Sequence, residues 1–149
     1  MSSDQKFLPE GIPDWQQPFW DSLRQRSIKV QRCASCGAFR HVPKEICAKC
    51  YSTSFSWEPV SGRGVVYTYT IVHRAPTAAY QGSAPYTIVH VAMDEGFRIV
   101  GTMTGNDPDS MEIGAPVRVV YTDLAPEWTI VEFEPATDTH ELVDNARDD

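Results

Sequence analysis

Along most of the chain after residue 55, apolar residues alternate with polar or small ones, the spacing of a strand with one buried face. The clearest run covers residues 63–73. Shorter runs fit residues 86–93, 97–104, 116–122 and 128–133, and glycine, proline and aspartate separate them. Strands of this number close into a small barrel more readily than they form an open sheet, because closure removes exposed edges. We predict a five-stranded barrel.

Residues 14–26 follow a helical pattern instead, in which Trp15, Phe19 and Trp20 fall near one face. We predict one short amphipathic helix there. Three large aromatic side chains are more than so short a helix needs, so they either cover the core or form a partner surface.

Other segments lack a clear period. Residues 1–13 are predicted to form an extended arm, and the acidic residues 136–149 a flexible tail. Residues 75–85 form a long loop of small residues between two strands, and we predict a turn over residues 123–126. Tyr80 and Tyr86, in or beside the long loop, are further candidates for partner contact, although an ordinary barrel loop is the alternative.

The four cysteines have the order C-x2-C-x10-C-x2-C and are Cys33, Cys36, Cys47 and Cys50. Each C-x2-C turn directs two sulfurs at one point, so four thiolates can surround a tetrahedral ion. No ligand position remains for water or substrate, and we therefore predict a structural zinc ion. Two disulfides, or an iron centre with the same ligands, are the alternatives.

Charge is divided along the chain, whose net charge is -7. Residues 24–50 carry seven basic side chains and one acidic side chain, whereas residues 94–149 carry fourteen acidic and three basic ones. The basic residues either offset the charge of a zinc tetrathiolate or form an anion site.

No segment approaches the roughly 18 apolar residues of a membrane span, and the N-terminus lacks a basic stretch followed by an apolar run. We therefore expect a cytoplasmic protein without membrane contact. A reducing compartment also favours metal-bound thiolates over disulfides. With every cysteine assigned to metal and no histidine paired with an acid at readable spacing, we expect no catalytic residue.

The ordered motifs resemble a family of acyl-CoA-associated proteins that join an N-terminal helix, a rubredoxin-like zinc ribbon and an OB-fold. The resemblance covers roughly residues 14–135. Its motifs are Pro18-Phe19-Trp20, Gln31-Arg32-Cys33 with Cys36-Gly37, Val42-Pro43, Gly62-Arg63-Gly64 with Val66, Tyr69-Thr70 with Val72-His73, Pro85-Tyr86 and Asp94-Glu95-Gly96. Two turns depart from the family: Tyr51 stands where glycine is frequent, and Gln25-Arg26-Ser27 replaces a frequent glycine turn.

The resemblance implies an accessory subunit, in a hetero-oligomer with a thiolase-like large subunit. The large subunits include thiolases, acyltransferases and the thiolase-like aldolases of steroid side-chain breakdown. Some relatives instead join enoyl-CoA hydratases of the MaoC type. In this family the large subunit carries the catalytic residues, while the small subunit stabilises the large one and helps form the acyl-CoA channel. The resemblance therefore implies that both subunits contact acyl-CoA.

Coenzyme A carries several phosphates, which basic side chains could bind. The candidates are Arg40, Lys44 and Lys49 in the ribbon and Arg63 and Arg74 at the barrel rim. A scaffold that never touches coenzyme A is an alternative.

Zinc ribbons and OB barrels also bind single-stranded nucleic acid. Residues 51–149 sum to -10, however, and a barrel of that sign would repel a phosphate backbone. We therefore rank nucleic-acid binding below the acyl-CoA hypothesis. The predicted protein is mainly β: an arm and helix (1–27), a zinc ribbon (28–53), a five-stranded OB-fold barrel (54–135) and an acidic tail (136–149).

Overall fold

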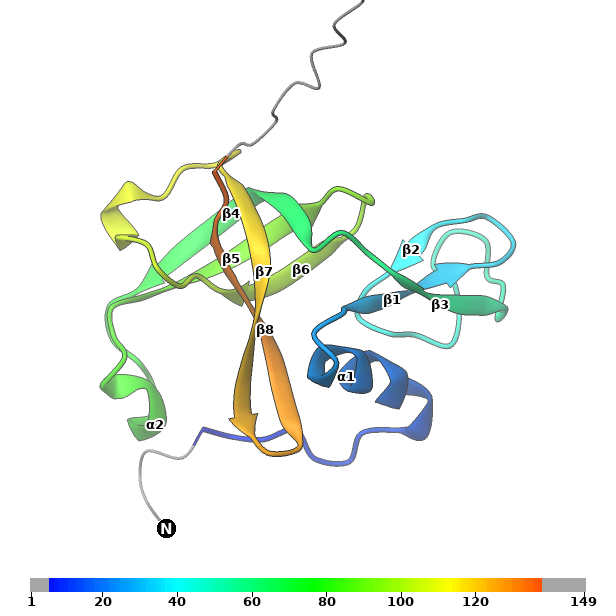
Figure 1. Cartoon of the computed structure of the whole chain (residues 1–149), viewed down its shortest axis with the longest axis horizontal. Coiled ribbons are helices and arrows are strands. Elements are labelled where there is room, and N and C mark those ends of the chain that lie inside the picture. Colours follow the sequence, from blue (N-terminus) through cyan, green and yellow to red (C-terminus); the bar gives the residue numbers. More distant parts are fainter. Residues whose placement is uncertain (1–5, 138–149) are drawn as a thin grey trace, which may run out of the picture.

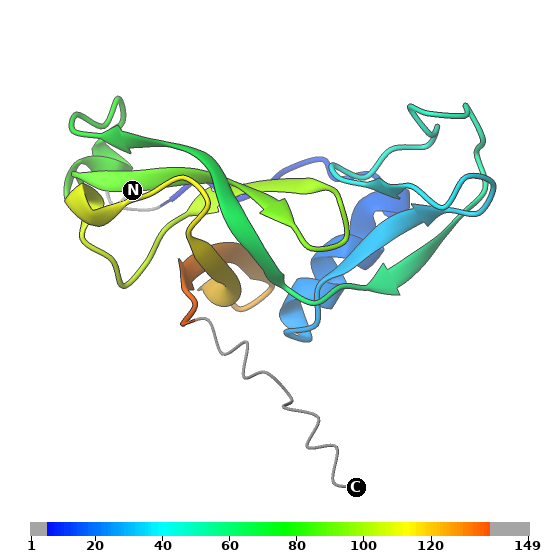
Figure 2. The same ribbon diagram turned by 90° about the horizontal axis from the view of Figure 1, so that it is seen from above.

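A computed structural model describes residues 6–137 and contains a three-stranded sheet, a five-stranded barrel and helix α1 (Gln17–Arg24) between them (Figures 1 and 2). It confirms the mainly β fold with one N-terminal helix. Most of the predicted tail and the first five residues of the arm lie outside the described residues. Within residues 6–137, no helix has both the length and the apolar character needed to cross a bilayer.

The ribbon sheet has the antiparallel order β2-β1-β3. Its strands are β1 (Lys29–Cys33), β2 (Phe39–Arg40) and β3 (Phe55–Pro59). Strand β1 leads directly into the first cysteine pair. Strand β3 pairs with β1 along its whole length, although the expected boundary assigned it to the barrel. Because its backbone hydrogen bonds belong to the ribbon, we propose that the barrel begins after β3, near Ser61.

The barrel has the strand order β6-β5-β4-β7-β8. Its strands are β4 (Arg63–Val72), β5 (Tyr86–Met93), β6 (Arg98–Thr102), β7 (Pro116–Ala125) and β8 (Trp128–Pro135). A parallel bridge between Met103 and Phe133 brings the end of β6 to β8 and closes the barrel. This order and closure are those of an OB-fold, and all five predicted strands are present.

Two segments predicted to lack regular structure contain some. Residues 75–85 include the short helix α2 (Ala78–Gln81), and β7 continues to Ala125 through the predicted turn. The register of β7 against β8 shifts between Asp123 and Ala125. A bulge of this kind preserves strand pairing while it interrupts the alternating pattern, which explains the wrong prediction. The remaining elements are the 3-10 helices η1 (Asp14–Gln16) and η2 (Pro108–Ser110).

One hydrophobic core joins the barrel to α1 and β1. Phe19 and Leu23 of α1 pack with the buried residues of the barrel, among which Phe133 is fully buried. A Cβ atom on Gly101 would lie 2.9 Å from two ring carbons of Phe133. Only glycine therefore lets β6 approach β8 this closely without displacing the ring.

Helix α1 ends in a Schellman motif, in which the Arg26 N–H donates to the Leu23 carbonyl at 2.9 Å. Arg26 has a φ of 54°, in the left-handed region that favours glycine. Its guanidinium donates to the Tyr121 carbonyl at 3.0 Å and pairs with Asp123 at 2.7 Å. The residue that ends the helix thus also fastens it to β7.

Candidate functional site

The four cysteines meet at one end of the ribbon, with all four sulfurs within 4.8 Å of one another. The Cys33–Cys50 sulfurs are 3.5 Å apart and the Cys36–Cys47 sulfurs 3.7 Å. A regular tetrahedron with zinc–sulfur bonds of about 2.3 Å has edges of about 3.8 Å. Disulfide sulfurs would be about 2.0 Å apart. The donor set therefore fits one zinc ion, as predicted, and not two disulfides.

The two C-x2-C turns share one backbone geometry. Gly37 and Tyr51, which follow them, have φ values of 73° and 62°. The Gly37 N–H donates to the Cys33 carbonyl, and the Tyr51 N–H donates to the Cys47 carbonyl, each at 2.9 Å. Both departures from the family's glycine pattern, Tyr51 and Arg26, thus hold a non-glycine residue in the left-handed region.

Backbone amides of these turns favour the anionic form of two sulfurs. The Cys36 N–H is the main cause that lowers the pKa of the Cys33 thiol to about 6. The Cys50 and Lys49 N–H groups lower the pKa of Cys47 in the same way. Since zinc binds the thiolate, both turns are arranged for metal binding.

Three of the five predicted phosphate-binding residues share a cavity of about 240 Å³ between the ribbon and the β5–β6 turn: Arg40, Lys44 and Lys49. Arg98 also lines it. Sequence reasoning missed Arg98 because alternation alone did not place it beside the ribbon. We call this space the basic cavity.

Arg63 and Arg74 do not line the basic cavity. Arg63 begins β4 and Arg74 follows its end, so the length of this ten-residue strand separates them by about 30 Å. The structure therefore does not bring the five candidates together.

Arg40 is the buried member of the basic cavity, with 6% of its surface exposed. Its Nη1 donates to the Lys44 carbonyl at 3.1 Å, and the guanidinium lies 4.8 Å from the centre of the Phe55 ring. Within the described residues its Nε and Nη2 have no hydrogen-bond partner. A buried guanidinium with two unused donors is matched to an anion.

A second space, the apolar cavity, has a volume of about 370 Å³ and lies between α1, the ribbon and strands β6 and β8. Its lining residues are Phe19, Trp20, Leu23, His41, Val42, Ile99, Val100, Gly101, Thr102, Ile130 and Val131. It shares His41 and Val42 with the basic cavity. Burial lowers the pKa of His41 to about 4, so this imidazole is neutral at pH 7.

The predicted partner residues lie in two separate groups. In the first, Phe19 is packed in the core, and Trp20 meets Trp128 edge to face with ring centres 5.3 Å apart. Trp15, half-buried in η1, precedes them. In the second, the Tyr80 and Tyr86 ring centres are 6.2 Å apart beside α2. Phe19 thus has a core position, while the partner role of the others remains a prediction.

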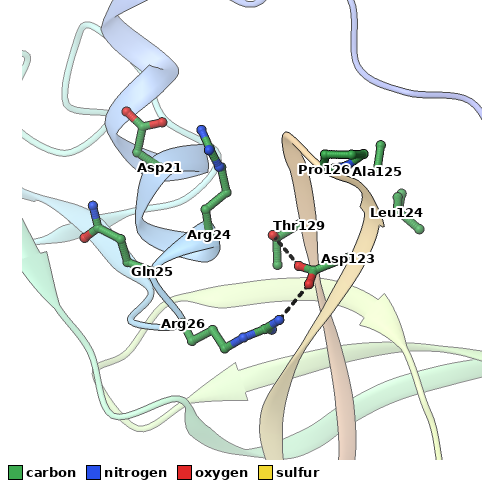
Figure 3. Close-up of a pocket in the computed structure, with 9 residues that line it drawn as sticks. All are labelled: Asp21, Arg24, Gln25, Arg26, Asp123, Leu124, Ala125, Pro126 and Thr129. Carbon is green, nitrogen blue, oxygen red and sulfur yellow. Dashed lines mark hydrogen bonds and ion pairs between the residues drawn. The ribbon is translucent and has the colours of Figure 1, made fainter.

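A third space of about 600 Å³ separates the end of α1 from the β7–β8 hairpin (Figure 3). Arg26 reaches across it to Asp123, whose other carboxylate oxygen accepts from the Thr129 hydroxyl at 2.7 Å. The Thr129 hydrogen bond, followed by the charge of Arg26, lowers the pKa of Asp123. The paired charges indicate a structural link between helix and hairpin.

Two family descriptions match adjacent parts of the chain. The ChsH2 rubredoxin-like zinc ribbon domain matches residues 20–56, and the ChsH2 C-terminal OB-fold domain matches residues 57–122.

Individual proteins are similar as well. A probable enoyl-CoA hydratase alpha subunit from Thermomonospora curvata is 38% identical over 83% of this chain and 38% of its own length. The benzoylsuccinyl-CoA thiolase subunit BbsA from Geobacter metallireducens is 32% identical over 52% of this chain and 51% of its own length. The chain thus spans about half or less of these curated relatives.

A solved structure described as the Ltp2-ChsH2(DUF35) aldolase has a chain that superposes with a TM-score of 0.78 at 33% identity. The match covers 87% of the present chain and 100% of that chain. Both halves of the molecule and their order are therefore shared. The chain belongs to the ChsH2 (DUF35) family, in which a rubredoxin-like zinc ribbon precedes a C-terminal OB-fold domain.

Proposed function

We propose that this chain is a non-catalytic accessory subunit of a thiolase-superfamily enzyme that acts on an acyl-CoA. The large subunit would be a thiolase, an acyltransferase or a thiolase-like aldolase. One observation carries the proposal: the chain matches the full length of a ChsH2(DUF35) chain from an aldolase structure. The similarity to a benzoylsuccinyl-CoA thiolase subunit supports it.

The chemistry of the site favours a supporting role. All four cysteines lie in the metal cluster, which leaves no open coordination position. His41 is enclosed by aromatic rings, and His90 meets Tyr67 edge to face with ring centres 5.8 Å apart. The large subunit would supply the nucleophile, and this chain would stabilise it and help form the acyl-CoA channel.

Contact with acyl-CoA would be shared with the large subunit. Arg40, Lys44, Lys49 and Arg98 of the basic cavity are the residues that we propose for the phosphates of coenzyme A. We also propose a cytoplasmic location, because thiolate ligands persist in a reducing compartment.

The name of the Thermomonospora curvata relative favours a second candidate, in which the partner is an enoyl-CoA hydratase of the MaoC type. The acyl-CoA substrate class would be the same. The partner and the reaction would differ.

Co-purification of the tagged protein from its native cell extract tests both candidates. We expect a stoichiometric thiolase-superfamily protein, and acyl-CoA turnover only when the two proteins are combined. A hydratase that co-purifies in stoichiometric amount, in place of a thiolase-superfamily protein, would favour the second candidate over the first. Recovery of the chain alone, or salt-sensitive retention of single-stranded DNA, would contradict both.

A further inference from the structure

Strands β4, β5 and β6 form one layer of the barrel, with β7 and β8 on its opposite side (Figure 2). Among residues 6–137, no helix or strand crosses the outer side of this layer. Every second residue of β5 is buried, so the residues between them, which include Tyr86, His90 and Ala92, are directed outward. Val65 pairs with Ala92 and Val100 pairs with His90, which places both valines on the same side. We call this side the outer face.

The outer face carries large apolar side chains that are open to water. Val65, Tyr67 and Val100 are 41%, 47% and 60% exposed. On a sheet with one solvated face, the outward positions are normally polar. Exposed apolar side chains that gather on one face indicate an interaction surface.

The charge of the outer face differs from that of the chain. None of the residues of β4, β5 and β6 is acidic, although the chain has 20 acidic residues and a net charge of -7. Arg63 and Arg98 are exposed at the starts of β4 and β6, and Arg98 pairs with Ala92 of the outer face. A partner surface with carboxylates around an apolar centre would complement this distribution of charge.

The outer face continues into the apolar cavity at the edge of β6. Val100 belongs to the outer face and also lines this cavity, which Trp20 lines from α1. At the other end of the outer face, Tyr86 lies beside Tyr80 of α2. The two groups of predicted partner residues therefore lie at two edges of one surface, and the apolar cavity offers a pocket for an anchoring side chain.

We propose that the outer face, with the apolar cavity at its edge, docks the large subunit through an apolar patch that carboxylates surround. This inference rests on the proposed accessory function and adds the location and chemistry of the subunit contact. Val65, Tyr67 and Val100 would form the apolar centre, and Arg63 would pair with a carboxylate of the large subunit. The Arg98 guanidinium lies 3.6 Å from the centre of the Tyr67 ring, and Arg98 also lines the basic cavity. The proposed phosphate site would then adjoin the large subunit, as shared contact with acyl-CoA requires.

Two other occupants fit the outer face less well. Single-stranded nucleic acid stacks its bases on open aromatic rings, whereas the Tyr67 ring has the Arg98 guanidinium on one face and meets His90 edge to face. A second copy of the chain would bring two basic faces together, and neither would supply a carboxylate from β4, β5 or β6. A large subunit with acidic residues around its contact patch satisfies both the apolar and the basic groups.

Isothermal titration of the full chain with the purified large subunit, once co-purification has identified it, tests the location. Val65→Glu places a carboxylate at the centre of the outer face, and Ile46→Glu makes the matched change at a 53% exposed position of the ribbon. We expect at least about tenfold weaker binding for Val65→Glu and unchanged binding for Ile46→Glu. Arg63→Gln should slow association about threefold at low salt and reduce its salt dependence, whereas Arg24→Gln on α1 should do neither.

Val100→Glu repeats the test on β6, and urea unfolding of each variant shows that a loss of binding is not a loss of folding. If Val65→Glu and Ile46→Glu bind equally well, the location is wrong while the accessory function stands. If no large subunit co-purifies, both are wrong. Retention of single-stranded DNA that depends on Arg63, or a dimer of the chain that Val65→Glu dissociates, would overturn the choice of partner.

Discussion

The approach of Gly101 to Phe133 predicts a large effect from one added methyl group. In Gly101→Ala the new Cβ would lie 2.9 Å from two ring carbons of Phe133 and 3.2 Å from the Val131 carbonyl oxygen. Phe133 is fully buried, so the ring cannot move away without disturbing the core. Overpacking of this kind costs about 1–3 kcal/mol of unfolding free energy.

A second glycine provides the control. Gly82 has a φ of -71° and no heavy atom within 4 Å of an added Cβ. Gly82→Ala should therefore be neutral or stabilise the protein by about 0.5 kcal/mol, through the loss of unfolded-state entropy. Because Gly101→Ala gains the same entropy term, the difference between the two variants isolates the overpacking cost of about 1–3 kcal/mol.

Urea unfolding of the zinc-saturated protein measures both variants from the midpoint and slope of the transition. The Phe133→Leu background supplies the cross-check, since a leucine side chain can rotate away from residue 101. There the Gly101→Ala cost should fall below about 0.5 kcal/mol, which would appear as strong coupling in the double-mutant cycle. Equal stability of the Gly101 and Gly82 variants would refute the close packing of β6 against Phe133.

The other predictions concern the metal site, a strained turn and one buried histidine. Cys47→Ser should lose zinc and unfold the ribbon, because the energy of metal binding is part of the folding energy in such modules. Full zinc content by elemental analysis, together with an unchanged far-ultraviolet circular dichroism spectrum, would count against this prediction. Tyr51→Gly should raise the free energy of unfolding by about 0.5 kcal/mol, because relief of left-handed strain of about 1–2 kcal/mol exceeds the entropic cost of glycine and the side chain is 79% exposed. An unfolding midpoint below that of the unchanged protein would show that the ring makes an important contact. Burial lowers the pKa of His41 from 6.5 to about 4, so below pH 6.5 the unfolded state takes up a proton that the folded state does not, and stability is lost as the pH falls toward 4. Between pH 7 and pH 5 this loss is about 2 kcal/mol, and His41→Phe should reduce the pH dependence by that amount in unfolding curves; parallel curves for the two proteins would exclude the effect.

The sequence predicted the elements whose signals are local. The alternating pattern located all five barrel strands, and the cysteine spacing predicted the metal cluster. Both signals depend only on residues that are close together in the sequence. Strand β3 pairs with β1, although the predicted barrel range of 54–135 included its residues, since alternation does not show which strand a segment pairs with. The end of β7 was not predicted, because the bulge at Asp123 interrupts the alternation of apolar and polar residues.

The site was only partly predictable, because it depends on long-range packing. Arg40, Lys44 and Lys49 are close in sequence and share one cavity, but Arg98 joins them only through the fold. Arg74 looked equivalent in sequence but follows the end of β4 that lies away from the ribbon. The apolar cavity could not be foreseen at all, since its lining combines α1, the ribbon and two barrel strands.

Arg26 has a consequence for how sequences of this family can diverge. Glycine at this position would relieve about 1–2 kcal/mol of backbone strain but remove an exposed ion pair worth up to about 1 kcal/mol and one hydrogen bond worth about 1 kcal/mol. The entropic cost of glycine adds about 0.5–1 kcal/mol to the loss, so arginine is the more stable residue here by about 1 kcal/mol. Relatives with glycine at this position should therefore hold the helix less rigidly against the barrel, a property that hydrogen exchange in α1 would show directly.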